Sequence, residues 1–563
     1  MKAYNTLRLS LNRSLHVDSP PMVPGQSFSY VHGASSVSLL GQTGGQSLQA
    51  AADRWPHREA LVFLQDGVRK TFSQFQENVD QAAAGLLALG LRRGDRLGVW
   101  GPNTYHWILF QFATAKAGII LVSINPAYQL KELEYTLGKV QCKAVVCPTQ
   151  FKTQRFCDML RQICPEMDTA ESGVFRSSRL PDLCMVIVTD SRQTGTVHVE
   201  DVVQAGSRQN HQELQDLQTK LSFDDPINIQ FTSGTGSPKG ATLSHHNIVN
   251  NSYFVGLRLG FDWRTHLTPL TVNLHITLIG AMCMALNGIT LVFPSSGYDS
   301  RDNLEAILNE RCNFLYSTPT MYIDMLGQPD LHKYDLSSVE TGKRFEDETM
   351  LMFTSYGTTE NSPITFLGFP RDNEELMTQT VGCILNHTEA KVVDVSSGEV
   401  VPLGDPGELL IRAYSVMLKY WDDPDKTSEA ITKERWYRTG DIASLDRFGY
   451  CRKVGRIKDM IIRGGENIYP AEIEQFLHTH PNVQEAQVIG VRDERMREQV
   501  CACIRLKEGQ DCSREVIRDF CKGQISHFKI THYVVFVDIF PLTGSGKIQK
   551  IKPREEMEKK LCL

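Results

Sequence analysis

The sequence lacks an excess of charge of either sign. Among its 563 residues, 59 are Lys or Arg and 65 are Asp or Glu, which gives a formal net charge of −6. Acidic and basic residues are intermixed, and there is no basic stripe of the kind that nucleic acid binding requires. We therefore expect no nucleic acid partner.

The sequence also lacks a long hydrophobic run. Its longest apolar stretch, at residues 278–293, is interrupted by Asn287 and Gly288 and is too short to span a bilayer. The same stretch suits a buried helix followed by a strand. We therefore expect a soluble protein without a transmembrane segment.

The 14 cysteines show no pairing pattern. The two closest are Cys501 and Cys503, and the sequence has neither a CxxC pair nor histidines at the spacing of a zinc site. This scatter is typical of a protein that folds in a reducing compartment.

The length and the N-terminus bound the organisation of the chain. A chain of 563 residues exceeds what one hydrophobic core supports, so we expect two or more domains, with enough volume to enclose an active site. Residues 1–17 carry Lys2, Arg8 and Arg13 and no acidic residue, as in mitochondrial transit peptides. Residues 1–30 are thus either a transit peptide of a mitochondrial matrix protein or the disordered, uncleaved N-terminus of a cytoplasmic one.

Helical and strand patterns alternate along the chain. The sequence predicts a helix at residues 80–89, a strand at 97–100, a helix at 107–116 and a strand at 119–122. This order indicates an α/β fold with parallel sheets covered by helices. A boundary near residues 455–459 separates a large domain at 31–455 from a small α+β domain at 456–563.

Residues 232–240 combine hydroxyls, glycines and one cation directly after a strand-like segment. Glycines let successive N–H groups line one concavity, hydroxyls add donors, and a lysine adds positive charge opposite phosphate oxygens. The alternative interpretation is a solvated turn before a helix. The candidate phosphate-binding residues are Thr232, Ser233, Gly234, Thr235, Gly236, Ser237, Pro238 and Lys239.

Two further segments carry candidate site residues. Tyr356, Thr359 and Glu360 offer an aromatic face, a hydroxyl and a carboxylate to a nucleotide and its Mg²⁺, although an ordinary strand end has the same pattern. Asp441 and Arg456 lie on the two sides of a hairpin-like segment. They suit ribose hydroxyls and a phosphate, or they are solvated surface charges.

A final lysine completes a series of motifs. Lys547 ends the loop PLTGSGK, which taken alone could be a polar tail loop. Together, these segments and the stretches AGIILVSINPAYQ, GATLSHHNIVNNS and DMIIRGGENIYPAEIE make the chain resemble the adenylate-forming superfamily of acyl-CoA synthetases, from about Ser47 to the C-terminus. The resemblance is strongest to the medium-chain fatty acid:CoA ligases.

The resemblance implies a fold and a reaction. The fold would be a large adenylate-forming domain with parallel sheets covered by helices, followed by a small mobile α+β domain. The reaction would join a medium-chain fatty acid to CoA through an acyl-adenylate, with ATP and Mg²⁺, and would release AMP and pyrophosphate. One active site would perform both half-reactions after rotation of the small domain.

The resemblance also implies roles for the residues that bind the nucleotide. Residues 232–239 would form the ATP phosphate loop. Tyr356, Thr359 and Glu360 would contact adenine, phosphate and metal, and Asp441 would hold the ribose hydroxyls.

Further implied roles belong to the C-terminal part of the chain. Arg456 would contact the nucleotide, and Lys458 would sit at the hinge. Lys547 would enter the site only for adenylate formation, where its charge would stabilise the transition state. Gly464 and Gly465 would face the pantetheine tunnel after rotation.

The sequence departs from the family pattern at several places. The phosphate loop is one residue short between Thr235 and Gly236, which would move Lys239 relative to the γ-phosphate. Only residues 339–355 stand where the family has a β-α-β unit of roughly thirty residues. Arg497 stands where glycine or proline is usual, and His275 matches either a residue of the acyl pocket or a core histidine.

Three hypotheses follow from the matches and departures. In the first, the chain is a working medium-chain fatty acyl-CoA ligase. In the second, it is a catalytically impaired or noncatalytic relative that binds CoA or a partner protein. In the third, adenylation serves an acceptor other than CoA, which the RGGENIYP segment at residues 463–470 disfavours because it resembles that of CoA users.

Overall fold

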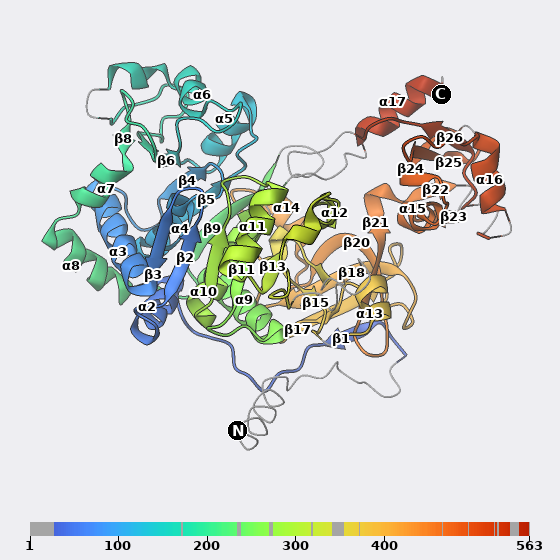
Figure 1. Ribbon diagram of the computed structural model, residues 1–563, viewed down its shortest axis with the longest axis horizontal. Coiled ribbons are helices and arrows are strands. Elements are labelled where there is room, and N and C mark those ends of the chain that lie inside the picture. The colour runs from blue at the N-terminus through green and yellow to red at the C-terminus, as the bar shows by residue number, and fades with distance from the viewer. Residues whose placement is uncertain are drawn as a thin grey trace. The chain divides into compact units, whose positions relative to one another are not determined.

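The computed structural model describes most of the chain (Figure 1). The described residues are 27–170, 173–232, 238–269, 274–316, 319–340, 354–370, 372–463, 466–493, 495–522, 524–525, 529–540 and 551–561. They form two compact units. The first contains His32–Glu389 and Arg412–Tyr437, and the second contains Ala390–Ile411 and Arg438–Leu563 together with residues 27–31.

The domain boundary predicted at residues 455–456 stays a prediction. The second compact unit includes the segment after it, but also segments that precede it in the sequence. The transit peptide predicted within residues 1–30 lies almost entirely outside the described residues. No helix of the described ranges is long and apolar enough to cross a membrane.

An eight-stranded sheet dominates the first unit (Figure 1). Its strand order is β19-β10-β9-β5-β4-β6-β7-β8. The strands from β9 to β8 pair in parallel, whereas β10 and β19 run antiparallel at one end. The bounds are β4 (Arg96–Trp100), β5 (Ile120–Ile124), β6 (Ala144–Cys147), β7 (Met185–Val188), β8 (Val197–His198), β9 (Pro226–Thr232), β10 (Lys239–Ser244) and β19 (Lys419–Tyr420).

The β-α-β order predicted for this region is confirmed. Helix α3 (Phe72–Ala88) precedes β4, and α4 (Tyr105–Ala117) connects β4 to β5. Helix α4 is buried from Trp107 to its end because its apolar residues surround the whole helix. It ends at Gly118, whose φ of +65° is the left-handed conformation that glycine adopts at low cost. Helices α3 and α4 pack side by side (Figure 1).

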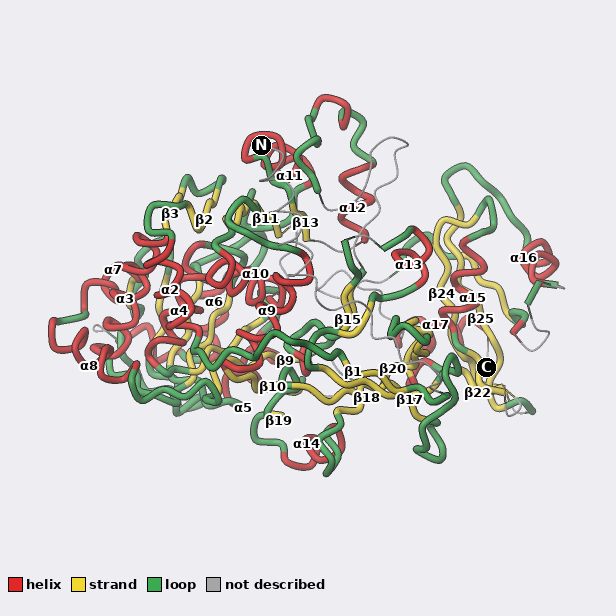
Figure 2. The backbone as a smooth tube through the Cα atoms, turned by 90° about the horizontal axis from the view of Figure 1, so that it is seen from below, coloured by secondary structure: helices red, strands yellow, loops and turns green. Residues whose placement is uncertain are grey.

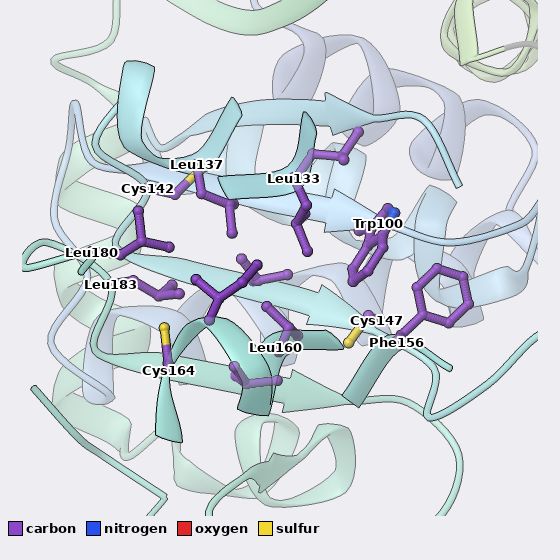
Figure 3. Packing of buried hydrophobic residues seen from close by; sticks show 14 of the residues in the cluster. Trp100, Leu133, Leu137, Cys142, Cys147, Phe156, Leu160, Cys164, Leu180 and Leu183 are labelled. Atoms are coloured by element: carbon purple, nitrogen blue, oxygen red, sulfur yellow. The ribbon is translucent and has the colours of Figure 1, made fainter. Parts of the chain in front are cut away.

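One face of the eight-stranded sheet packs against a large hydrophobic cluster (Figure 3). Helices α5 (Leu130–Lys139) and α6 (Phe156–Ile163) cover this face. Trp100 and Phe156 meet edge to face, with ring centroids 4.4 Å apart. Ile229 of β9 belongs to the same cluster, so the cluster fixes which face of β9 points into the core.

A second sheet of the first unit has the order β13-β11-β12-β2-β3. The apolar stretch at residues 278–293 forms the end of helix α10 (Leu274–Asn287) and strand β12, as predicted, with Gly288 between them at a φ of +68°. Helix α10 packs against α9 (His245–Leu259). The strands are β2 (Glu59–Phe63), β3 (Val68–Thr71), β11 (His266–Pro269), β12 (Thr290–Phe293) and β13 (Phe314–Tyr316).

A small antiparallel sheet carries the predicted adenine-contacting tyrosine. Strand β14 (Ser355–Tyr356) pairs with β15 (Phe366–Leu367), which pairs with β16 (Cys383–Ile384). Residues 341–353, which include most of the segment where a β-α-β unit was expected to be missing, lie outside the described residues.

The second unit contains two sheets. One has the order β1-β17-β18-β20-β21 and includes the hairpin of β20 (Tyr437–Leu445) and β21 (Cys451–Arg456). The other is built on the long hairpin of β24 (Val483–Asp493) and β25 (Arg497–Leu506), beside which helix α15 (Pro470–His478) lies (Figure 2). The other elements are β1 (Tyr30–His32), β17 (Thr388–Val393), β18 (Gly407–Ala413), β22 (Ile461–Arg463), β23 (Glu466–Ile468), β26 (Tyr533–Phe536), α16 (Arg514–Cys521) and α17 (Ile551–Leu561).

Candidate active site

The predicted phosphate loop connects two antiparallel strands. Strand β9 ends at Thr232 and β10 begins at Lys239, and these two residues are register partners. Residues 233–237 lie outside the described residues. The chain continues after the loop as a strand, and helix α9 begins only at His245. The alternative interpretation, a solvated turn, stays untested, although the element that directly follows the loop is a strand and not a helix.

The side chains of β9 divide between the two faces of the sheet. Ile229 points into the hydrophobic cluster, so Gln230 and Thr232 alternate with it on the opposite face. Register partners in antiparallel strands share a face. Lys239 pairs with Thr232, whereas Ala241 pairs with both Gln230 and Tyr420. Thr232, Lys239 and Tyr420 therefore lie on one face, at the end of the sheet where the loop begins.

Lys239 and Glu360 are linked through a residue that the sequence analysis missed. The Lys239 ammonium donates to the Tyr420 hydroxyl at 3.1 Å and lies 4.4 Å from the centroid of its ring. The same hydroxyl donates to Glu360 Oε1 at 2.8 Å. The structure thus brings together residues of two predicted motifs.

The segment from Tyr356 to Glu360 is buried and tightly held. Tyr356, Thr359 and Glu360 are all buried, and the last two lie in the 3₁₀ turn Thr359–Asn361. The Glu360 carbonyl accepts a hydrogen bond from the Met417 N–H at 2.7 Å. A Cβ atom at Gly357 would lie 1.5 Å from the Pro363 carbonyl oxygen, so only glycine permits this backbone path.

The acidic side chain of this segment keeps neighbouring phenols protonated. Burial raises the pKa of Tyr420, and the charge of Glu360 raises it further. Burial followed by the charges of Glu360 and Tyr420 likewise raises the pKa of Tyr437 well above its usual range. Both phenols are therefore hydrogen-bond donors at neutral pH.

Two buried amides near these elements have unused hydrogen-bonding capacity. Both amide atoms of Gln230 and both of Asn361 are buried, and neither side chain finds a partner in the described part of the chain. A bound water or ligand usually satisfies such groups. These amides carry no motif signature, so sequence analysis had no signal for them.

The predicted ribose-binding pair forms in the second unit. Asp441 and Arg456 are cross-strand partners on β20 and β21, which confirms the predicted hairpin. Asp441 Oδ1 lies 3.1 Å from Arg456 Nε and 3.3 Å from Lys453 Nζ. The Asp441 side chain is only 2% exposed, and its N–H donates to the Thr439 hydroxyl at 3.0 Å. Two cationic side chains of its own hairpin thus contact this carboxylate through Oδ1.

The remaining predicted site residues are placed only in part. Lys458 is exposed in the 3₁₀ turn Ile457–Asp459 that follows β21. Gly464 and Gly465 lie outside the described residues, between the paired residues Arg463 and Glu466. Lys547 also lies outside them. His275 is the second residue of helix α10, but its side chain is not among those that the structure describes.

The described residues contain no group of three or more His, Cys, Asp or Glu side chains that could hold a metal ion. A dedicated metal cage is not what Mg²⁺ requires, because Mg²⁺ commonly binds one or two carboxylates together with substrate phosphates. A single carboxylate, that of Glu360, beside a phosphate loop fits this mode of binding.

Comparison with known proteins identifies the family. The AMP-binding enzyme family model matches residues 48–421, and the model of the AMP-binding enzyme C-terminal domain matches residues 472–547. The chain belongs to the AMP-binding enzyme family. The resemblance to the adenylate-forming superfamily, inferred from about Ser47 onward, is thereby confirmed, and the family's C-terminal domain is present.

Several relatives within this family match nearly the whole chain. The mitochondrial medium-chain acyl-CoA ligase ACSF2 of Danio rerio is 62% identical, covering 98% of this chain and 94% of that protein. Its namesake from Homo sapiens is 52% identical, covering 98% and 93%. The putative acyl-CoA synthetase YngI of Bacillus subtilis is 36% identical, covering 92% and 97%.

Solved structures share the fold. The anthranilate CoA ligase AuaEII, in complex with anthranoyl-AMP, has a TM-score of 0.77 at 25% identity and covers 94% of this chain and 99% of that one. ATP-bound MatB from Rhodopseudomonas palustris has a TM-score of 0.78 at 24% identity, covering 92% and 100%. The predicted α/β fold class is confirmed.

Proposed function

We propose that this chain is an AMP-forming acid–thiol ligase that joins a medium-chain fatty acid to CoA. The observation that carries the proposal is the 62% identity to a medium-chain acyl-CoA ligase over 98% of the chain. That relative and its mammalian counterparts are named as mitochondrial, so we place this protein in the mitochondrion as well. ATP and CoA are its co-substrates.

The reaction has two steps. In the first, a fatty acid carboxylate oxygen attacks the α-phosphorus of ATP, the bond between the α- and β-phosphates breaks, and pyrophosphate leaves. In the second, the CoA sulfur attacks the acyl carbon, the bond to the phosphate oxygen breaks, and AMP leaves. The thiol proton is released. The thioester, AMP and pyrophosphate account for all atoms.

Residues of the loop after β9 and of the segment from Tyr356 to Glu360 would bind the triphosphate and the adenine. Residues 232–239 would bind the phosphates, with the Lys239 ammonium supplying positive charge. Tyr356 would lie against adenine and Thr359 would contact phosphate. Glu360 would hold Mg²⁺, which when bound neutralises charge on the phosphate oxygens. The proximity of Lys239 and Glu360 through Tyr420 supports this arrangement.

Residues after Tyr437 would bind the sugar and supply the groups that act in only one half-reaction. Asp441 would accept hydrogen bonds from the ribose hydroxyls, and Arg456, 3.1 Å from it, would contact the nucleotide. Lys458 would act as the hinge, and Gly464 and Gly465 would let pantetheine approach the backbone. Lys547 would stabilise the charge that develops in the first step.

The noncatalytic alternative lacks comparable support. It rests on the shortened phosphate loop and on the short segment before Tyr356, both of which fall largely outside the described residues. The contacts that are described, at Lys239, Glu360, Asp441 and Arg456, are those a working site would need.

The test is octanoate-dependent exchange of radiolabelled pyrophosphate into ATP by the purified protein. Exchange above an enzyme-free control supports the ligase. The matched variant Lys547→Ala should abolish exchange yet still form thioester from supplied octanoyl-AMP and CoA. A folded wild-type protein without exchange would favour the noncatalytic alternative, and equal loss of both half-reactions would remove the role given to Lys547.

A further inference from the structure

Tyr420 connects two charged residues that come from different motifs. Its hydroxyl donates to Glu360 Oε1 at 2.8 Å and accepts from Lys239 Nζ at 3.1 Å. A phenol has one proton, so donation to the carboxylate leaves only lone pairs for the ammonium. The hydrogen bonds therefore run in one direction, from Lys239 through Tyr420 to Glu360.

We propose that Tyr420 is a positioning residue that keeps Lys239 and Glu360 apart and aims them at the triphosphate and its metal ion. This inference rests on the proposed function of the chain. Without the phenol between them, the ammonium and the carboxylate would attract each other into a direct ion pair. Each would then compete with its intended ligand, phosphate for the lysine and Mg²⁺ for the glutamate.

The backbone fixes the place of the phenol. Tyr420 is 2% exposed and pairs with Ala241 at the edge of the eight-stranded sheet. Its N–H donates to the Thr427 hydroxyl at 3.0 Å. Since backbone and ring are both held, the hydroxyl has little freedom to follow either charged group, as a separator requires.

The hydrogen-bonding capacity left over suits the proposed ligands. The bond from Tyr420 engages Oε1 of Glu360, and no group of the described residues bonds to Oε2, which is left for a cation. The ammonium of Lys239 has three donors, of which the phenol takes one.

Another buried tyrosine, Tyr322, has the hydrogen bonding of an ordinary structural residue. The Tyr322 hydroxyl donates to the Leu315 carbonyl at 3.0 Å, a neutral backbone partner. Tyr420 differs because both partners of its hydroxyl are charged side chains. Tyr322 therefore provides a control, because Tyr322→Phe removes one hydrogen bond to an uncharged partner, whereas Tyr420→Phe removes two hydrogen bonds to charged side chains.

The experiment compares Tyr420→Phe and Tyr322→Phe with wild type in the pyrophosphate exchange assay over a range of Mg²⁺ concentrations. Phenylalanine keeps the ring beneath the Lys239 ammonium and removes only the hydroxyl. We expect Tyr420→Phe to raise the half-saturating Mg²⁺ concentration about tenfold, the effect of losing one hydrogen bond to a charged group. The KM for octanoate should stay within about twofold, and Tyr322→Phe should leave the Mg²⁺ requirement unchanged.

The outcomes separate this inference from the proposed function. Wild-type protein without exchange would contradict the proposed function itself. Wild-type exchange with an unchanged Mg²⁺ requirement in Tyr420→Phe would overturn the role of Tyr420. So would a fall in rate that is the same at every Mg²⁺ concentration, because a purely structural role predicts that pattern.

A second measurement uses ligand-free protein and does not depend on Tyr420→Phe folding. Lys239→Met, Glu360→Gln and the double variant are unfolded in guanidinium chloride. If the phenol couples the two charges, the midpoint shift of the double variant should differ from the sum of the single shifts. Additive shifts would mean that no such connection exists and would overturn the proposal.

Discussion

The Nδ1 atom of His245 accepts a hydrogen bond from the backbone N–H of Gly44 at 3.0 Å, although the two residues are 201 positions apart. Gly44 is the first residue of helix α2 (Gly44–Arg54), where backbone N–H groups have no partner within the helix. His245 begins helix α9 and is fully buried. The imidazole thus caps a helix from a distant part of the chain and can do so only while Nδ1 is unprotonated.

We expect protonation of His245 to lower the stability of the protein as pH falls from about 6.5 to about 4. Burial lowers the pKa of His245 from 6.5 to about 4 in the folded protein. Between these values the unfolded chain binds the proton and the folded chain does not, so unfolding is favoured as pH falls. The loss is at most about 3 kcal/mol, at roughly 1.4 kcal/mol for each pH unit.

Guanidinium unfolding at pH 7 and pH 5 measures this effect. His245→Gln keeps an acceptor for the Gly44 N–H but cannot titrate, so its stability should change less between the two pH values. His57→Gln, at an exposed histidine, is the control and should behave as wild type. An unaltered pH dependence in His245→Gln would show that other groups are responsible.

Replacing Arg497 with glycine should make the protein more stable. Its φ of +71° lies in the left-handed region, which costs a non-glycine residue about 1–2 kcal/mol. It begins β25 and pairs with Asp493 at the end of the hairpin with β24. Glycine relieves this strain but loses more chain entropy on folding, which offsets part of the gain. We therefore expect Arg497→Gly to raise the free energy of unfolding by about 1 kcal/mol, measured by guanidinium unfolding. Arg495→Gly in the same turn should give no gain, and a loss of stability in Arg497→Gly would contradict the argument.

Local patterns were sufficient for the elements that hold the site in place. The alternation at residues 97–122 predicted β4, α4 and β5, and the break at Asn287 and Gly288 predicted the passage from α10 to β12. Boundaries were less accurate. Helix α3 begins at Phe72, before the predicted residue 80, because Thr71 and Gln74 form a capping box that the sequence analysis did not use.

The site was predictable where its residues are close in sequence. Asp441 and Arg456 meet across one hairpin, and a hairpin can be predicted from its own residues. Tyr420 lies 181 positions from Lys239 and 60 from Glu360, on a two-residue strand. Nothing in its local sequence indicates that β19 pairs with β10, since such a pairing depends on the whole fold.

Gly357→Ala should displace the segment that carries Thr359 and Glu360. The added Cβ would lie 1.5 Å from the Pro363 carbonyl oxygen, so the backbone must move. We expect a loss of about 3 kcal/mol in unfolding free energy, as for severe overpacking, together with loss of pyrophosphate exchange. Gly138→Ala is the control, because its Cβ would contact only Leu180 Cδ2 at 3.4 Å. Normal pyrophosphate exchange by Gly357→Ala would mean that activity does not depend on the present backbone path of this segment.

Asp441→Asn should weaken ATP binding about tenfold to a hundredfold, measured by calorimetry. The change removes the negative charge and one acceptor atom, and hydrogen bonds to a charged group contribute more than neutral ones. Glu408→Gln is a matched control in the same sheet, since Glu408 is also buried and lies 3.0 Å from Arg438. It should bind ATP as wild type does.

A change of nucleotide distinguishes ribose recognition from a general effect of charge. If Asp441 accepts from the ribose hydroxyls, wild-type protein should bind ATP more tightly than 3′-deoxyadenosine triphosphate, and Asp441→Asn should discriminate less. Alternatively, Asp441 acts only through Arg456 and Lys453, whose cationic groups lie 3.1 and 3.3 Å from its Oδ1. In that case Asp441→Asn should lower the affinity for both nucleotides by the same factor. Equal weakening, or an unchanged affinity for ATP, would remove the ribose assignment while leaving the fold and the family of the chain as they are.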